Sequence, residues 1–189
     1  MYLESVILFI FTVPIWVIIR FVLYIKNRKY NSFSLKREML LNIFFLYILC
    51  LFSVTFFPMY IHFDEYDNWI SVNFIPIVNT VKEIIAVGDS GMADFMIQFW
   101  IKNIVGNLIL LLPLGFFLPI LWNKFQDGRK TVLFAFCFSL SIELLQLLLM
   151  YIGVYGRAFD IDDIILNTLG ACIGYLIYKK FIGKRVFVR

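Results

Sequence analysis

Two pairs of polar side chains lie within apolar stretches of this chain, at spacings that give each pair a common helix face. Asn103 and Asn107 are four residues apart, and Glu143 and Gln146 are three apart. Residues 131–152 are otherwise apolar apart from small hydroxyl side chains. Because a glutamate facing lipid is costly, we expect Glu143 to face a bundle interior or a wet cavity. There it could act as a general base or acid.

A second polar segment combines one cation with several carboxylates. Arg157 is followed by Asp160, Asp162 and Asp163, and Asn167 comes one turn later. Arg157 would pair with an acid or hold an anionic group such as phosphate or carboxylate. Asp162 and Asp163 join Glu143 as hypothetical catalytic carboxylates. The structural alternatives are that Asp160 caps the following helix and that the asparagines hydrogen-bond between helices.

The three aspartates also raise the question of a metal ion. Hard cations take carboxylate oxygens, so Mg²⁺ or Ca²⁺ at Asp160, Asp162 and Asp163 is conceivable. The signal is weak, because a loop that faces water often carries such residues. We therefore expect no metal and no cofactor. The single histidine, His62, lies in the loop predicted at residues 59–100, so we expect no Ser-His-Asp triad at the polar pairs within the spans. Catalysis is left uncertain, with a non-enzyme favoured.

The elements that must position these residues are membrane helices. The chain is 62% hydrophobic and 16% charged, which a soluble domain of 189 residues could not bury. We predict an all-α, polytopic membrane helix bundle of about five spans, each able to cross about 30 Å of hydrocarbon. The expected spans are Ser5–Ile25, Met39–Pro58, Ile101–Trp122, Thr131–Ile152 and Asp162–Tyr178.

The distribution of basic residues orients this bundle. Of the 17 lysines and arginines, 13 lie between spans one and two, between spans three and four, or in the tail. The positive-inside rule places these segments in the cytoplasm, so the N-terminus is outside and the C-terminus inside. Arg20 can extend its side chain to the same, cytoplasmic side. The basic clusters would meet anionic lipid headgroups, and the net charge of +4 implies no nucleic-acid partner.

With this orientation, four polar side chains from three spans lie at similar depths in the outer half of the bilayer. Asn107, Gln146 and Asn167 lie about 8–9 Å below the outer ends of their spans, and Glu143 lies about 13 Å below. We interpret this layer as one wall of a polar pocket that opens outward. Asn103, Asn107, Gln146, Arg157, Asp160 and Asn167 are the candidate ligand-binding residues.

One membrane domain accounts for most of the chain. Residues 1–38 form the first span and a basic loop, residues 39–180 form the main membrane domain, and residues 181–189 form a basic tail. The outer loop at residues 59–100 is unusually long. Residues 74–87 within it suggest either a short helix at the membrane interface or a plain surface loop with aromatic anchors.

Small residues and prolines predict how the spans pack. Gly170 and Gly174 form a GxxxG pattern, which favours close packing and also permits an oligomer. Gly106 and Gly115 are expected to be close-packing positions on the third span. Pro113, with Pro119, is expected to kink or end that span.

Several segments in this order resemble the VanZ-like family of bacterial membrane proteins. They are NFIPI at 73–77, NIVGNLILLLPLGFFLP at 103–119, SIELLQ at 141–146 and GRAFDIDDIILNTLGACIGY at 156–175. The resemblance covers roughly residues 40–180. The motif positions that carry over are Asn103, Gly106, Asn107, Pro113, Gly115, Glu143, Gln146, Arg157, Asp160, Asp162, Asp163, Asn167 and Gly170.

This resemblance implies a role in the cell envelope. The family is named for a member that gives low-level resistance to teicoplanin, a lipoglycopeptide that binds cell-wall precursors at the outer membrane surface. We therefore expect a multi-pass protein of the bacterial cell membrane that binds or modifies an envelope component through the polar pocket. A lipid-linked precursor, a lipid headgroup and a lipoglycopeptide are the candidate ligands.

Two other functions compete with this hypothesis. A non-catalytic scaffold or drug-excluding protein would act through the outer loop, with the polar layer serving only to join helices. A transporter is the third hypothesis, although five spans without a visible inverted repeat do not favour alternating access.

Overall fold

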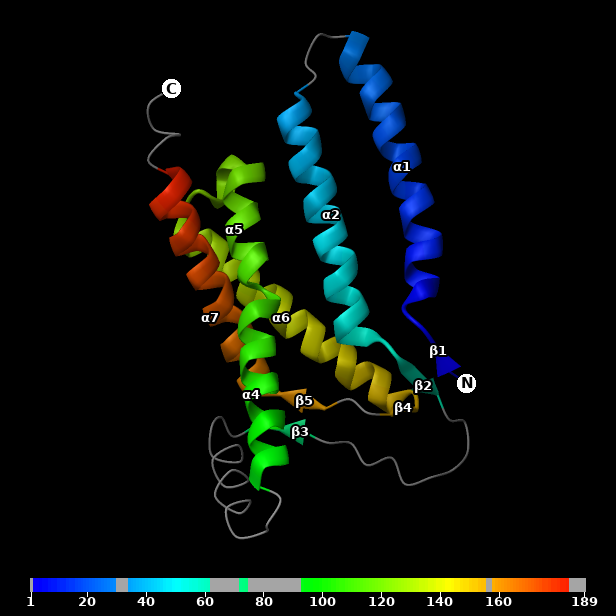
Figure 1. The fold of residues 1–189 in the computed structure, drawn as a ribbon, viewed down its shortest axis with the longest axis vertical. Coiled ribbons are helices and arrows are strands. Elements are labelled where there is room, and N and C mark those ends of the chain that lie inside the picture. The colour runs from blue at the N-terminus through cyan, green and yellow to red at the C-terminus, as the bar shows by residue number, and fades with distance from the viewer. Residues whose placement is uncertain (1, 30–33, 62–71, 75–92, 156–157, 184–189) are drawn as a thin grey trace. The chain divides into compact units, whose positions relative to one another are not determined.

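The computed structural model describes residues 2–29, 34–61, 72–74, 93–155 and 158–183. Helices make up most of this described part (Figure 1). They are α1 (Val6–Lys29), α2 (Leu35–Phe56), α4 (Ala93–Leu110), α5 (Leu112–Leu121), α6 (Gly128–Tyr151) and α7 (Ile161–Tyr178). A 3-10 turn, η1 (Asn123–Phe125), precedes α6, and a π-helical turn, η2 (Lys179–Gly183), extends α7.

Five stretches of this part are long and apolar enough to cross a membrane. They are Val6–Lys26, Leu35–Phe56, Ile101–Leu121, Gly128–Tyr151 and Ile161–Gly183. Each overlaps a span predicted from the sequence, and the all-α membrane bundle is thereby confirmed. The largest differences lie at the second and the last stretch, because α2 starts four residues earlier than expected and the last stretch continues through η2.

The first compact unit contains residues 1–64 and 154–156. Its helices α1 and α2 are joined by polar contacts as well as apolar ones. Trp16 Nε1 donates a hydrogen bond of 2.9 Å to Asn42 Oδ1, and the ring of Trp16 stacks on Phe45 at 4.2 Å between centroids. Arg20 forms an ion pair with Glu38, so the side chain expected to extend toward water alone has a carboxylate partner.

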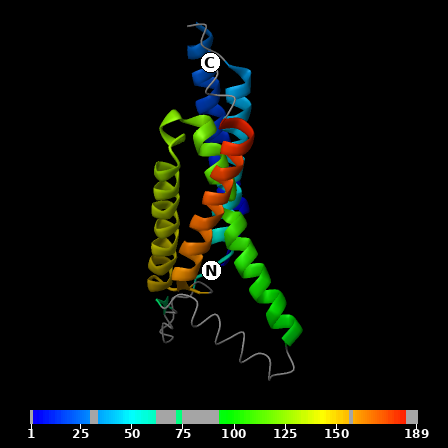
Figure 2. The same cartoon turned by 90° about the vertical axis from the view of Figure 1, so that its left-hand side faces the viewer.

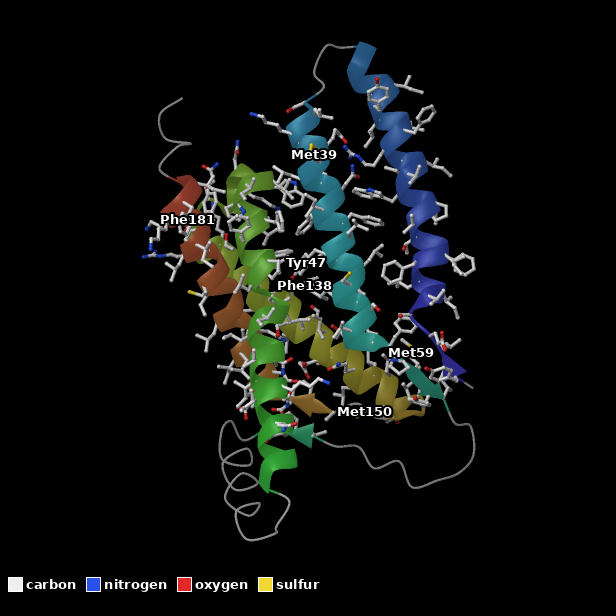
Figure 3. All side chains as sticks on the ribbon, in the orientation of Figure 1. Met39, Tyr47, Met59, Phe138, Met150 and Phe181 are labelled. Carbon is white, nitrogen blue, oxygen red and sulfur yellow. The ribbon has the colours of Figure 1, made fainter. Side chains whose placement is uncertain are left out.

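Short strands close one end of this unit. Strands β1 (Tyr2–Leu3), β2 (Met59–Ile61) and β4 (Val154–Tyr155) form an antiparallel sheet in the order β1-β2-β4. Many apolar side chains of α1 are exposed (Figure 3), and no residue in the apolar window of the span Val6–Lys26 is fully buried in the protein. A helix that is apolar but unburied is suited to contact lipid.

The second compact unit contains residues 65–153 and 157–189. Helix α7 lies at its centre and packs against α4, α5 and α6 (Figure 1). The core between these helices includes Leu111, Leu114, Ala135, Ile142 and Ala171, each no more than 2% exposed. Strands β3 (Val72–Asn73) and β5 (Phe159–Asp160) pair in parallel at the start of α7.

Glycines allow α7 to approach the third span at backbone distance. A Cβ atom added to Gly170 would lie 1.9 Å from Leu108 O, and one added to Gly174 would lie 2.0 Å from Leu112 O. A Cβ on Gly115 would in turn lie 1.9 Å from Ala171 O. The chain's own helices thus occupy the GxxxG face, and an oligomer contact through Gly170 and Gly174 would require this packing to open.

The third span is broken into two helices. Helix α4 ends at Leu110 and α5 begins at Leu112, with φ −101° and ψ 3° at Leu111 between them. Pro113 follows in the first turn of α5, where its missing N–H costs little. The break predicted from Pro113 is present, whereas Pro119 lies inside α5 near its end.

Candidate functional site

A cluster of polar side chains surrounds the start of α7 in the second unit. We call it the polar cluster, and its members are Asn73, Asn103, Asn107, Ser139, Glu143, Asp160, Asp162, Asp163 and Asn167. They come from β3, α4, α6, β5 and α7, and hydrogen bonds join these elements.

Asp160 is the N-cap residue of α7. Its Oδ1 atom accepts a hydrogen bond of 2.9 Å from the backbone N–H of Asp162, which satisfies one of the free amides of the first turn. The same oxygen accepts a bond of 3.0 Å from Asn73 Nδ2 on the paired strand. The capping role considered for Asp160 is therefore present, together with a tie to β3.

Glu143 completes this cap from another helix. Its Oε2 atom accepts a hydrogen bond of 3.1 Å from the backbone N–H of Asp160. In a capping box, the residue three positions after the N-cap makes this bond, and that residue here is Asp163. Glu143 of α6 takes this place, which leaves the carboxylate of Asp163 available for α4.

The carboxylate of Glu143 is enclosed within a membrane span. The residue is only 2% exposed, and it forms no ion pair within the described part of the chain. Its Oε1 atom accepts no hydrogen bond from a described residue. The sequence prediction that Glu143 faces the bundle interior is confirmed, and one of its two oxygens has no hydrogen-bond partner among the described residues.

Asp163 is held by α4. Asn107 Nδ2 donates a hydrogen bond to Asp163 Oδ1, and it also lies 3.1 Å from Asn103 Oδ1 on the preceding turn. The shared face predicted for Asn103 and Asn107 is thus the face that α4 presents to α7. These three side chains are half-buried.

A deeper contact joins α6 and α7. Asn167 Nδ2 donates a hydrogen bond of 3.0 Å to Ser139 Oγ, and both side chains are at most 1% exposed. The other amide atom, Asn167 Oδ1, is buried and has no hydrogen-bond partner among the residues that the structure describes. Burying a polar atom without a hydrogen bond costs free energy. Asn167 Oδ1 therefore marks a place where the hydrogen bonds among the described polar groups are incomplete.

Two members of the cluster were not anticipated as site residues. Ser139 lies one helical turn before Glu143, and that spacing was the available signal. Asn73 belongs to the NFIPI stretch, but its contact with Asp160 spans 87 positions of sequence, which no local pattern reveals. Phe74 next to it packs its ring 5.4 Å from that of Phe159, which is buried beside the N-cap.

Other predicted residues are placed differently or fall outside the description. Gln146 is half-buried on α6, one turn beyond Glu143. Arg157 lies outside the described residues, as do residues 62–71 and 75–92 of the outer loop. Within the described ranges, no group of three or more His, Cys, Asp or Glu side chains is arranged to hold a metal ion.

The sequence was also compared with known proteins. The VanZ/LLP1 family model matches residues 44–184, a range that contains the whole polar cluster. Helix α1 and the first turns of α2 lie outside it. No curated protein and no solved structure matches the chain.

Proposed function

We propose a function from the premise that the chain belongs to the VanZ/LLP1 family, since the family model matches well over half of its length. It is a multi-pass membrane protein with five helical stretches able to span a bilayer. We propose that it works in the bacterial cell membrane and modulates low-level resistance to teicoplanin-type lipoglycopeptides. The resistance part of this proposal rests on the member for which the VanZ-like family is named.

The polar cluster is the proposed working part. It binds or modifies an envelope component, such as a lipid-linked wall precursor, a lipid headgroup or the lipoglycopeptide itself. The excess of basic residues in the predicted cytoplasmic segments supports an outer position for the cluster. A ligand that reaches it would come from the outer leaflet.

The observation that carries this proposal is the state of Glu143. Placing an ionisable side chain inside a membrane span costs free energy, so such a residue usually marks a functional site. Glu143 is 2% exposed and accepts a single hydrogen bond from the described residues. Its free oxygen would accept a hydrogen bond or a proton from a bound ligand. Asp163 and Asp162 would supply further carboxylates, and the amides of Asn103, Asn107 and Asn167 would orient the ligand.

A second function draws on the same contacts. Asn73, Asn107 and Asn167 each donate a hydrogen bond to a neighbouring element, as residues that merely join helices would do. In that case the protein is a non-catalytic scaffold or drug-excluding protein, and the outer loop is its working part. Arg157 would hold an anionic group only under the first function.

Teicoplanin susceptibility of a sensitive bacterial host separates these two functions. The host would express the wild type, Glu143→Gln or Glu143→Ala at matched membrane levels. A glutamine can still accept the hydrogen bond from the Asp160 N–H, so Glu143→Gln removes the carboxylate while keeping the cap. Ser141→Ala is the matched control, because Ser141 is exposed on the same helix and bonds only to its own backbone turn.

We expect the wild type and Ser141→Ala to protect and both Glu143 variants to fail. If Glu143→Gln protects as well as the wild type, the carboxylate is not the working group. Deletion of residues 64–91 would then be expected to abolish protection, as the scaffold function requires.

A further inference from the structure

A groove of about 480 Å³ runs along the side of α4 in the second unit. We call it the α4 groove, and its lining residues are Gln98, Ile101, Lys102, Val105, Gly106, Ile109 and Leu110. Asn103 and Asn107 are absent from its lining because they face α7. Figure 2 shows the first turns of α4 leaning away from α6 and α7.

Gly106 lies in the middle of the α4 groove and differs from the other glycines of the spans. A Cβ atom added there would meet no described atom within 4 Å, whereas one on Gly170 would meet a backbone oxygen at 1.9 Å. The sequence prediction of close packing is therefore wrong for Gly106 within the described part of the chain. A glycine in a membrane helix permits close approach of a neighbour, and no described helix approaches Gly106 that closely.

The two ends of the groove differ in polarity. Lys102 lies at the start of the span Ile101–Leu121, is exposed, and forms no ion pair within the described residues. Ile109 and Leu110 lie deeper in the span, and Ile109 is 55% exposed. Eight residues of helix separate Lys102 from Leu110, a length of about 12 Å. An exposed cation at the start of the span is thus followed by an open, mostly apolar groove surface farther along the helix.

This arrangement complements a lipid with a negative headgroup. The side chain of a lysine near the boundary attracts anionic headgroups, with a contribution equivalent to about a fivefold change in affinity. The notch at Gly106 gives an acyl chain access to the helix backbone between Val105 and Ile109. Neither feature is used by the polar cluster, which lies on the opposite side of α4.

We propose that the α4 groove is a binding site for one anionic phospholipid of the surrounding leaflet. Its phosphate contacts Lys102, and one acyl chain lies across Gly106 toward Leu110. The site is separate from the proposed function of the polar cluster, so either can fail without the other.

Native mass spectrometry of the purified full chain tests this site, with phosphatidylglycerol and phosphatidylcholine of equal chain length as probes. The wild type should retain phosphatidylglycerol several-fold more strongly. Lys102→Gln should reduce that preference about fivefold. Gly106→Leu should fill the notch and remove binding of both lipids at this site. Lys124→Gln is the charge control, because Lys124 is exposed in η1, outside the groove. Leu169→Phe, on the exposed side of α7, is the size control.

Thermal unfolding of each variant distinguishes lost binding from lost folding, and Gly106→Leu should unfold within a few degrees of the wild type. Equal retention of the two lipids by the wild type would overturn the proposal, since it would describe ordinary solvation by the bilayer. So would unchanged binding in Lys102→Gln and Gly106→Leu. The proposal would also be overturned if the groove retained a polyprenyl phosphate that phosphatidylglycerol cannot displace. A second copy of the chain bound there in place of lipid would overturn it in the same way.

Discussion

Glu143 on α6 accepts the backbone N–H of Asp160, the residue that caps α7, at 3.1 Å. A neighbouring helix thereby supplies the acceptor that a capping box normally takes from the capped helix itself. The hydrogen bond joins α6 to the N-terminal end of α7. Glu143 is also the residue that the sequence predicted as a general base or acid. A structural and a functional role therefore meet in one side chain, and variants must be chosen to separate them.

The first prediction concerns stability at this contact. Glu143→Ala removes the acceptor and leaves the Asp160 N–H without its partner, which should cost about 1–3 kcal/mol. Glu143→Gln keeps an acceptor oxygen and should cost less than Glu143→Ala. Thermal unfolding in detergent, followed by circular dichroism, would measure the difference. If both variants lose stability equally, the hydrogen bond is not what Glu143 contributes to the fold.

A second prediction uses the contact between Asn107 and Asp163. Asn107→Ala should lose one interhelical hydrogen bond, worth about 0.6–2 kcal/mol in a membrane protein. Asn107→Asp should be more damaging, although it is closer in shape, because it places a second carboxylate against Asp163. The melting temperatures of Asn107→Ala and Asn107→Asp would be compared, and Asn107→Asp should melt at the lower temperature. An Asn107→Asp protein that melts above Asn107→Ala would show that the two side chains do not meet as described.

Hydropathy alone predicted most ends of the five membrane spans to within a few residues. The third span was expected at Ile101–Trp122 and is found at Ile101–Leu121, because a long apolar run has few alternatives to a membrane helix. The break at Leu111 also followed from the chemistry of Pro113. These features depend on residues that are close together in the sequence, so they can be predicted from one sequence alone.

The polar contacts were predicted only in part. Depth placed Asn107, Glu143, Gln146 and Asn167 in one layer, and three of these four, all but Gln146, are members of the polar cluster. Their partners were not predicted, because Ser139 resembles any small residue of a membrane helix and Asn73 lies 87 positions from its partner Asp160. Which side chains meet depends on how the helices are rotated and paired, and hydropathy does not encode that rotation.

The ion pair between Arg20 and Glu38 gives a third prediction, in the first unit. Both side chains are more than four-fifths buried, with 17% and 18% of their surfaces exposed, so each should depend on the other. Arg20→Gln and Glu38→Gln should each destabilise the α1–α2 pair, and the double variant should cost less than the two single costs combined. A double-mutant cycle on thermal unfolding should yield a coupling energy of about 1 kcal/mol or more. Strict additivity would mean that Arg20 is paired with water or lipid headgroups instead.

Glycine substitutions provide the last prediction, because two glycines of neighbouring spans differ only in what surrounds them. Gly170→Ala places a Cβ atom where Leu108 O now lies, so α7 and α4 must separate, at a cost of about 1–3 kcal/mol or more. Gly106→Ala meets open space among the described atoms and should be neutral or stabilise the helix by about 0.5–1 kcal/mol. Thermal unfolding of the two variants at matched detergent and lipid concentration would measure this contrast. Equal destabilisation would mean that the side of α4 at Gly106 is packed against another part of the protein, and the lipid site proposed there would lose its basis.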